Sequence, residues 1–302
     1  MLIITSAQTA SGNNMPKQSQ YKNMDYKMKL APRVITFMNN CLLFFLLSFS
    51  MVTFANVTIY KNEFSLLAYE ESDNGFITIT LLGGSNDAGD SSPADCTVKL
   101  IVKKSKATLS ASLLAFTTEL MGYDDTSGEV AQVERDVNQV RIYFAEPLSV
   151  CPLGTEFSGG YDKIDDVTND FKNAFISALT MNHLNALKEA SRGNNERAVR
   201  YMEPYMNEAL KRNIYGMAVY NDYGYFLQQA GRVKESLVFL NQVIAKNPAR
   251  IVAYLNVADS YWLAGDKRQA KTNYARYKYL MLHKGHTARI PARVSQRLNE
   301  QS

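Results

Sequence analysis

The chain has 302 residues, of which 46% are hydrophobic and 21% are charged. This composition is typical of a globular protein long enough for two domains, and it excludes a chain that is disordered throughout. The net charge of +4 comes from the first 55 residues, which hold five Lys/Arg and one acid, while the remaining 28 bases and 28 acids balance.

The N-terminal segment, residues 1–55, predicts a secretory signal. Its basic part is followed by a dense apolar run, CLLFFLLSFSMVTFA, which ends at the small residue Ala55. This order predicts export with cleavage after Ala55, and a periplasmic location for the mature chain. Translation from Met28 would give a leader of ordinary length and leave residues 1–27 untranslated. The alternative is an inner-membrane anchor formed by residues 38–57.

Two cysteines, Cys96 and Cys151, remain after the predicted leader. In an oxidising compartment such a pair favours a disulfide over two free thiols, although two buried thiols are the alternative. A bridge that closes a loop of about 55 residues would stabilise the chain by roughly 4 kcal/mol through the lost entropy of the unfolded state.

Residues 56–162 predict a small antiparallel β domain with one helix. Four segments rich in Val, Ile, Thr and Tyr have strand patterns: NVTIYKNEF, GFITITLL, CTVKLIVKK and NQVRIYFA. Residues 83–95 are expected to form a loop, and residues 151–163 a loop that leads into a linker. The spacing of leucines within residues 105–123 predicts a helix that covers the sheet.

The β domain contains no histidine, which excludes a histidine-dependent triad within it. Its carboxylates include two adjacent pairs, which we expect on solvated turns rather than in a catalytic dyad. These pairs are Glu70 with Glu71 and Asp124 with Asp125. The sequence therefore predicts no catalytic site, no metal site and no cofactor here.

From residue 163 to residue 302 the strand signals stop and helical spacing begins. Gly231 and Gly265 lie 34 residues apart, and each is followed five residues later by a small residue, Ser236 or Ala270. A glycine at such a position ends a helix in the left-handed conformation, and a small residue lets two antiparallel helices approach closely. A period of this length indicates stacked helical hairpins.

This pattern of large residues, Gly, Ala and Pro resembles the tetratricopeptide repeat family. The resemblance covers residues 217–250 and 251–284, with a degenerate unit at 179–212 and a polar capping tail at 288–300. The fold class is then α+β, with a β domain before a helical repeat stack. His283 and His286 are interpreted as surface residues, because no cysteine or acid near them completes a metal shell. His183 is interpreted as a helix-face residue rather than a base.

The resemblance implies a concave groove that holds a peptide or another protein. By the family's geometry, ten residues of the two clear units line this groove. They are Ala218, Asn221, Tyr225, Gln228, Gln229, Val252, Leu255, Asp259, Trp262 and Leu263. Trp262 is either an anchor for the partner or a packing residue against the C-terminal tail.

These observations lead to the hypothesis of an exported, non-enzymatic adaptor or scaffold that binds protein or peptide partners. Neither a cofactor nor nucleic acid is expected, and a membrane is expected only through an uncleaved leader. The alternative is an inhibitor or immunity-type protein that blocks an envelope enzyme or toxin through its β domain.

Charge is divided unevenly between the two halves. Residues 56–162 carry 16 acids and 7 bases, whereas residues 163–302 carry 12 acids and 21 bases, so the halves have net charges of −9 and +9. Opposed charge favours docking of the halves or separate partners of opposite sign, unless both faces are simply solvated. The base-rich end, residues 267–297, could also face an acidic partner or an anionic membrane.

Overall fold

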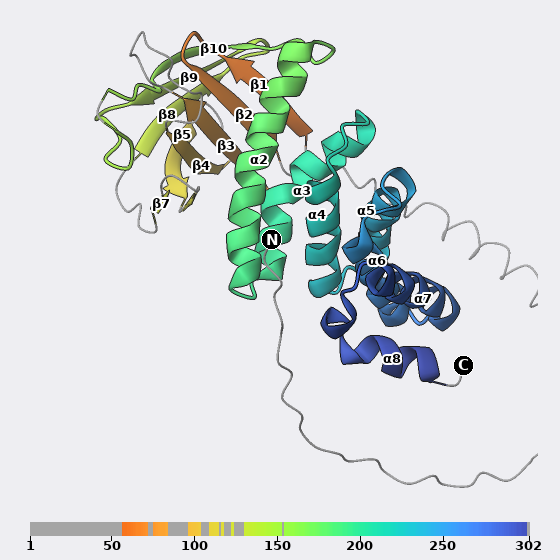
Figure 1. Cartoon of the computed structure of the whole chain (residues 1–302). Coiled ribbons are helices and arrows are strands. Elements are labelled where there is room, and N and C mark those ends of the chain that lie inside the picture. Colours follow the sequence, from red (N-terminus) through yellow and green to blue (C-terminus); the bar gives the residue numbers. More distant parts are fainter. Residues whose placement is uncertain are drawn as a thin grey trace, which may run out of the picture. The chain divides into compact units, whose positions relative to one another are not determined.

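The structure is a computed structural model that describes residues 56–71, 75–83, 96–103, 109–114, 116–117, 122–123, 130–152 and 154–300. The predicted leader, most of the predicted loop 83–95 and the carboxylates Asp124 and Asp125 lie outside these residues. The segment Phe54–Ser302 forms one compact unit, in which β-strands precede a run of helices (Figure 1).

Eight strands close into an antiparallel barrel in the order β1-β10-β9-β8-β5-β4-β3-β2, and two further strands pair separately. The barrel strands are β1 (Asn56–Lys61), β2 (Ser65–Glu71), β3 (Phe76–Gly83), β4 (Thr97–Lys103), β5 (Leu109–Leu114), β8 (Val130–Arg135), β9 (Gln139–Phe144) and β10 (Gly159–Lys163). The separate pair is β6 (Phe116–Thr117) with β7 (Gly122–Tyr123). Seven helices follow in the described part of the chain.

Successive residues of each strand point alternately into and out of the barrel, and those that point inward fill its interior. On β2, Leu67 and Tyr69 belong to the interior cluster, whereas Ala68 belongs to the cluster that includes the helices. The buried Tyr161 hydroxyl donates to the carbonyl oxygen of Phe157 at 2.9 Å. Burial raises the pKa of Tyr161 to about 12. This interior is a packed core of aliphatic and tyrosine side chains.

Two predictions for the β domain are wrong. The helix expected within residues 105–123 is instead strand β5, in which Leu109, Ala111 and Leu113 are buried and alternate with exposed serines. This alternation pairs β5 with β4 and β8. The expected loop at 151–163 contains strand β10, which closes the barrel between β1 and β9.

The predicted disulfide between Cys96 and Cys151 is confirmed, with a Cα–Cα distance of 5.6 Å. Cys96 immediately precedes β4 and is fully buried beside the barrel core. Cys151 lies between β9 and β10 and packs against the same cluster. The bridge therefore ties the connection before β10 to the strand on the other side of the barrel.

The helices form three consecutive hairpins and a short terminal helix. They are α2 (Asn169–Ser191) with α3 (Asn195–Lys211), α4 (Met217–Gln229) with α5 (Val233–Lys246), α6 (Ile251–Leu263) with α7 (Lys267–His283), and α8 (Ala292–Asn299). A 3₁₀ turn, η1 (Thr287–Arg289), precedes α8. Successive hairpins pack on each other, so the C-terminal half is a tetratricopeptide-like stack.

The recurring glycine ends the first helix of each hairpin. Gly231 has φ +80°, and its N–H donates to the carbonyl oxygen of Gln228 at 3.1 Å. The N–H of Arg232 donates to the carbonyl oxygen of Leu227 at 2.8 Å. These are the two bonds of a Schellman motif, and Gly265 repeats them 34 residues later. The period in the sequence therefore reflects a repeated helix stop.

Small residues set the distance between the helices of a hairpin. Ser236 on α5 is fully buried, and Gly224 on α4 lies opposite it. A Cβ added at Gly224 would lie 2.6 Å from Cγ of Leu240 and 3.3 Å from the carbonyl oxygen of Ser236. The Leu240 side chain of α5 thus occupies the space that a side chain at position 224 would need.

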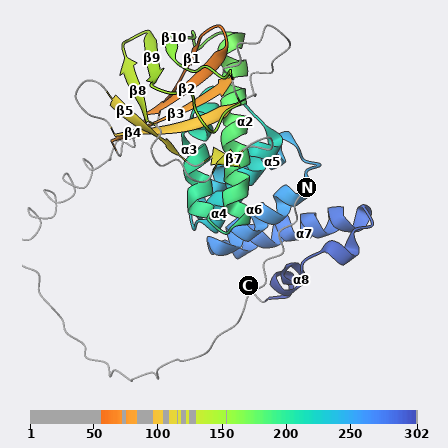
Figure 2. The same ribbon diagram turned by 90° about the vertical axis from the view of Figure 1, so that its left-hand side faces the viewer.

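The barrel and the first hairpin share one apolar core. Val57 and Ile59 on β1 belong to the same buried cluster as Phe171 and Phe175 on α2. Helix α2 runs beside β1 and β2 in both views (Figures 1 and 2) and contacts both strands. The two halves are therefore joined mainly by apolar packing, although they carry opposite net charges.

A buried ion pair lies within this interface. Nζ of Lys99 on β4 lies 2.9 Å from Oε1 of Glu70 on β2, and both side chains are only 3% exposed. Nζ of Lys99 also donates to Oδ1 of Asn182 on α2 at 2.7 Å, and the Tyr205 hydroxyl on α3 donates to Glu70 at 2.6 Å. Thr80 on β3 is a further donor to Glu70. The expectation that Glu70 is solvated is wrong, because α2 and α3 cover this face of the barrel.

Burial and the adjacent Glu70 carboxylate raise the pKa of Tyr205 well above its ordinary value, so this tyrosine stays a hydrogen-bond donor. Each member of the cluster has partners on other elements, and this arrangement offsets part of the cost of burying two charges. The cluster therefore fixes which face of the barrel receives the helices.

We predict that removal of the disulfide destabilises the segment from residue 56 onward without changing its fold. The Cys96→Ser, Cys151→Ser variant should lose roughly 4 kcal/mol of unfolding free energy in urea titrations, because a loop of 55 residues is no longer closed. Alkylation of the wild-type chain from residue 56 onward, without reductant, should label neither cysteine. Full labelling of both thiols would contradict the bridge.

A second prediction concerns the buried ion pair. Glu70→Gln should cost about 3–5 kcal/mol, because it leaves the Lys99 ammonium buried without its counter-charge. The double variant Glu70→Gln, Lys99→Met should be more stable than Glu70→Gln alone. Lys61→Met, which removes the exposed pair with Asp170, is the matched control and should cost less than about 1 kcal/mol. Equal losses for both single variants would show that the buried pair has no special role.

Candidate functional site

The first helices of the hairpins, α2, α4 and α6, lie next to one another and form the inner face of the stack. Polar side chains connect them in a continuous series of hydrogen bonds, which we call the inner-face network. Its members are His183 on α2, Asn221, Asp222 and Gln228 on α4, and Asn256 and Ser260 on α6. The network spans all three hairpins.

The network begins between α2 and α4. Nε2 of His183 lies 3.1 Å from Oδ2 of Asp222, and Oδ1 of Asp222 accepts a bond from Nδ2 of Asn221 at 3.1 Å. Oδ1 of Asn221 in turn accepts from Nδ2 of Asn256 on α6 at 3.2 Å. His183 and Asn221 are the fifth residues of the units that begin at 179 and 217. Their partners, Asp222 and Asn256, are the sixth residues of the units that follow, so the same contact occurs twice in succession.

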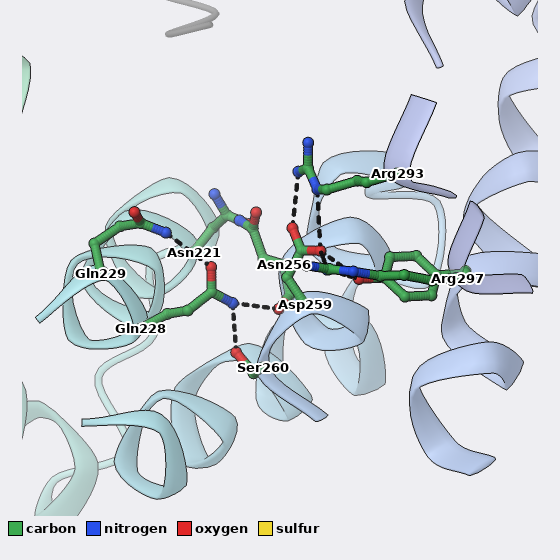
Figure 3. Close-up of polar contacts among 9 residues, drawn as sticks. Asn221, Gln228, Gln229, Asn256, Asp259, Ser260, Arg293 and Arg297 are labelled. Carbon is green, nitrogen blue, oxygen red and sulfur yellow. Dashed lines mark hydrogen bonds and ion pairs between the residues drawn. The ribbon is translucent and has the colours of Figure 1, made fainter. Parts of the chain in front are cut away.

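A second link joins the C-terminal ends of α4 and α6. Nε2 of Gln228 donates to the carbonyl oxygen of Asn256 at 2.8 Å and to Oγ of Ser260 at 2.6 Å (Figure 3). Gln229 donates to Oε1 of Gln228 at 3.1 Å. Because these amides already have protein partners, they hold the inner face in one arrangement before any ligand binds.

The ten residues predicted to line the groove differ in exposure. Four are exposed: Ala218, Gln229, Val252 and Leu263. Three are half-buried: Tyr225, Leu255 and Trp262. Three are buried: Asn221, Gln228 and Asp259. The buried polar residues belong to the interior of the stack, and the first two groups provide the surface that a partner could touch.

Helix α8 covers the inner face at the last hairpin. Arg293 forms two hydrogen bonds with the Asp259 carboxylate, at 3.2 and 2.8 Å, and Arg297 forms a third at 2.7 Å (Figure 3). The hydroxyl of Tyr274 on α7 also donates to Asp259. Burial and the Asp259 charge raise the pKa of Tyr274. The carboxylate predicted to face a ligand is thus bound by the protein's own C-terminal helix.

Trp262 also contacts this tail. Its ring lies 5.1 Å from the guanidinium carbon of Arg297 and 6.4 Å from the ring of Tyr274. Val294 of α8 is fully buried in the cluster that Trp262 packs against. The described contacts of Trp262 therefore include the C-terminal tail, as one of the two sequence interpretations expects.

Several residues of the site were not predicted from the sequence: Asn256, Ser260, Tyr274, Arg293 and Arg297. The two arginines have the spacing of one helix face within residues 292–299, which hold no acid, and Asp259 is the sole acid of α6. Two bases on one helix face and a single acid on α6 could have predicted the ion pairs between α8 and Asp259. Asn256 and Ser260 carried no such signal, because their roles depend on side chains of α4.

The remaining histidines do not gather at a site. His283 and His286 are exposed at the end of α7, and Nδ1 of His283 lies 2.9 Å from the carbonyl oxygen of Tyr279. Among the described residues, no group of His, Cys, Asp and Glu is placed to hold a metal ion. His183 is buried on α2 and pairs with Asp222 across two helices.

None of the helices within the described ranges is both long enough and apolar enough to cross a bilayer.

Comparisons with known proteins concern solved structures. The first TPR of Spaghetti (RPAP3), bound to the HSP90 peptide SRMEEVD, is 14% identical over 41% of this chain and 95% of that chain, with a TM-score of 0.34. MamA 41-end from Desulfovibrio magneticus RS-1 is 14% identical over 42% of this chain and 75% of that chain, with a TM-score of 0.31. No family model and no curated protein matches the sequence. The repeat architecture therefore rests on the helix pairs and turns of this chain.

We predict that Trp262→Ala lowers stability, because Trp262 packs against Arg297 and Tyr274. The loss should be about 2 kcal/mol, less than for a fully buried tryptophan, and it should appear as a lower melting temperature. Leu263→Ala is the matched control, because that neighbouring side chain is 56% exposed and its truncation should change little. An unchanged melting temperature for Trp262→Ala would contradict the packing role and favour the alternative, in which Trp262 is an anchor for the partner.

Proposed function

We propose that this protein is a non-enzymatic adaptor that binds an extended segment of a partner protein along the inner face of α2, α4 and α6. The observation that carries the proposal is that this face combines a preformed hydrogen-bond network with exposed apolar side chains. Val252 is 39% exposed and Leu263 is 56% exposed, on the same helix as the buried Asn256.

The chemistry of the inner face indicates the kind of segment it would bind. The amides of Asn221 and Gln228 are occupied, so they provide rigidity and little binding energy. Binding energy would come from burial of apolar surface at Val252 and Leu263 on α6, and from the half-buried Tyr225 on α4. Gln229 is exposed and offers amide hydrogen-bonding capacity to a partner backbone. A segment with apolar side chains in an extended conformation fits this surface.

The proposal also includes export to an oxidising compartment. The basic and apolar segment before Ala55 supports it, as does the Cys96–Cys151 bridge, since structural disulfides persist mainly outside the cytosol. The absence of catalysis is part of the proposal as well. The acid–base pair on the inner face, His183 with Asp222, is bound into the network that holds the helices together.

The experiment that tests the adaptor role is site-specific photocrosslinking in cells. A photoreactive amino acid at Gln229 should crosslink to a discrete partner, whereas the same group at Val238, exposed on the outer helix α5, should not. Val252→Asp together with Leu263→Asp should abolish the product at Gln229, because charges would enter an apolar contact.

The same experiment separates the adaptor from the inhibitor role. A photoreactive group at Tyr143, which is 60% exposed on β9, reports on partners of the barrel. Crosslinks at Tyr143 that persist in the Val252→Asp, Leu263→Asp variant, with none at Gln229, would contradict the adaptor proposal and favour an inhibitor that acts through the barrel.

A further inference from the structure

The C-terminal segment 267–299 has charge of one sign only. It contains nine Lys/Arg and no Asp or Glu, and it is flanked by Asp266 and Glu300. Four of the nine bases bind acceptors nearby. Arg293 and Arg297 pair with Asp259, Lys267 pairs with Glu300, and Lys271 donates to the backbone of Glu300.

The other five bases have no carboxylate partner within the part of the chain that the structure describes. They are Arg268, Arg276, Lys278, Lys284 and Arg289. All of them except the half-buried Lys278 are exposed. A surface of this kind attracts anions, because none of these five bases is neutralised by a paired carboxylate among the described residues.

Exposed aromatic and apolar side chains lie among these bases. Arg276 lies over the ring of Tyr279 at 5.4 Å, and the rings of Tyr279 and His283 are 3.9 Å apart. Tyr279 is 49% exposed and Leu282 is 47% exposed. Spacings of three, six and seven residues from Arg276 place these side chains on one face of α7.

The turn after α7 extends this surface. Eight successive residues, 282–289, are all exposed, and they include Lys284 and Arg289. Helix α7 is the second helix of its hairpin, so this surface is separate from the inner face formed by α2, α4 and α6. It is formed by one helix and one turn, and it suits a broad, flat partner better than an inserted segment.

We propose that the outer face of α7 and the following turn form a docking surface for an anionic lipid bilayer. The exposed bases would approach lipid phosphates, and Tyr279 and Leu282 would enter the interfacial region below them. A bilayer presents these two chemistries in layers, phosphate above hydrocarbon, in the same combination that α7 exposes. An acidic protein segment would complement the charge but would leave Tyr279 and Leu282 without an apolar partner.

This inference does not depend on the proposed partner of the inner face, and it does not involve the leader. Residues 56–302 contain all three buried clusters and lie within one compact unit, so this segment can be studied by itself. The leader must be absent, because its apolar run would bind any vesicle regardless of lipid charge.

The test is cosedimentation of residues 56–302 with vesicles of phosphatidylcholine alone or mixed with phosphatidylglycerol. Binding should require the anionic lipid. Each base near an anionic surface strengthens binding roughly five-fold, so Arg276→Glu, Lys284→Glu and Arg289→Glu together should lower affinity by about a hundred-fold or more. Tyr279→Ser with Leu282→Ser should also weaken binding, although the charge is unchanged.

The matched control reverses three exposed bases elsewhere on the helices: Lys172→Glu, Arg200→Glu and Lys234→Glu. It has the same net charge as the first variant and should retain most of the binding, and circular dichroism should confirm that all variants are folded. No binding to anionic vesicles, or equal losses in both charge-reversal variants, would overturn the proposal. The proposal would also be overturned, in favour of an acidic polymer, if the protein bound polyglutamate or a single-stranded oligonucleotide tightly and if Tyr279→Ser with Leu282→Ser left that affinity unchanged.

Discussion

The contact between the outer face of β1–β4 and helices α2 and α3 joins the barrel to the helical stack and covers the first end of that stack. A stack of helical hairpins has two ends, and each end exposes an apolar face that must be covered. At the first end, the barrel covers α2 and α3 through Val57 and Ile59, and through the pair of Glu70 and Lys99. Apolar contacts join the two parts there, and the buried pair favours this orientation, because another one would bury Glu70 and Lys99 without their hydrogen bonds to Asn182 and Tyr205.

Helix α8 covers the other end of the stack through a different set of contacts. Val294 enters the cluster around Tyr274 and Tyr277, and the two arginines of α8 neutralise Asp259. Helix α8 therefore packs on the last of the three described hairpins. This arrangement also limits the inner face. Asp259 and Trp262 contact α8, so under the adaptor proposal a partner would use the exposed residues Gln229, Val252 and Leu263 of α4 and α6.

The sequence predicted the parts of the structure whose cause is local. Gly231 and Gly265 determine where helices end, whatever surrounds them, and the 34-residue period follows from that. The cysteine pair was predictable because two cysteines after a predicted leader favour a bridge over two free thiols. By contrast, β5 was mistaken for a helix because Leu109, Leu113 and Leu114 also fit helical spacing, and only pairing with β4 and β8 decides between the two.

The inner face illustrates the same limit. The family's geometry identified Asn221 and Gln228 as inner-face residues, but their partners Asn256 and Ser260 lie one hairpin away, and no local pattern marks them. Glu70 was assigned to a solvated turn because two adjacent acids usually are solvated. Its burial results from Lys99, Asn182 and Tyr205, which come from three other elements. Such groups are determined by the tertiary fold alone.

The apolar interface determines where the opposite net charges of the two halves lie. Because packing joins the halves, the net charges of −9 in residues 56–162 and +9 in residues 163–302 remain largely on their outer surfaces. The exposed ion pair between Lys61 and Asp170 places a base on the barrel and an acid on α2. This pair is therefore not an attraction between the acidic net charge of the barrel and the basic net charge of the helices. Near an anionic bilayer, the acidic half would be repelled while the outer face of α7 is attracted. The inner face does not belong to this docking surface, so membrane attachment and partner binding would not compete for the same residues.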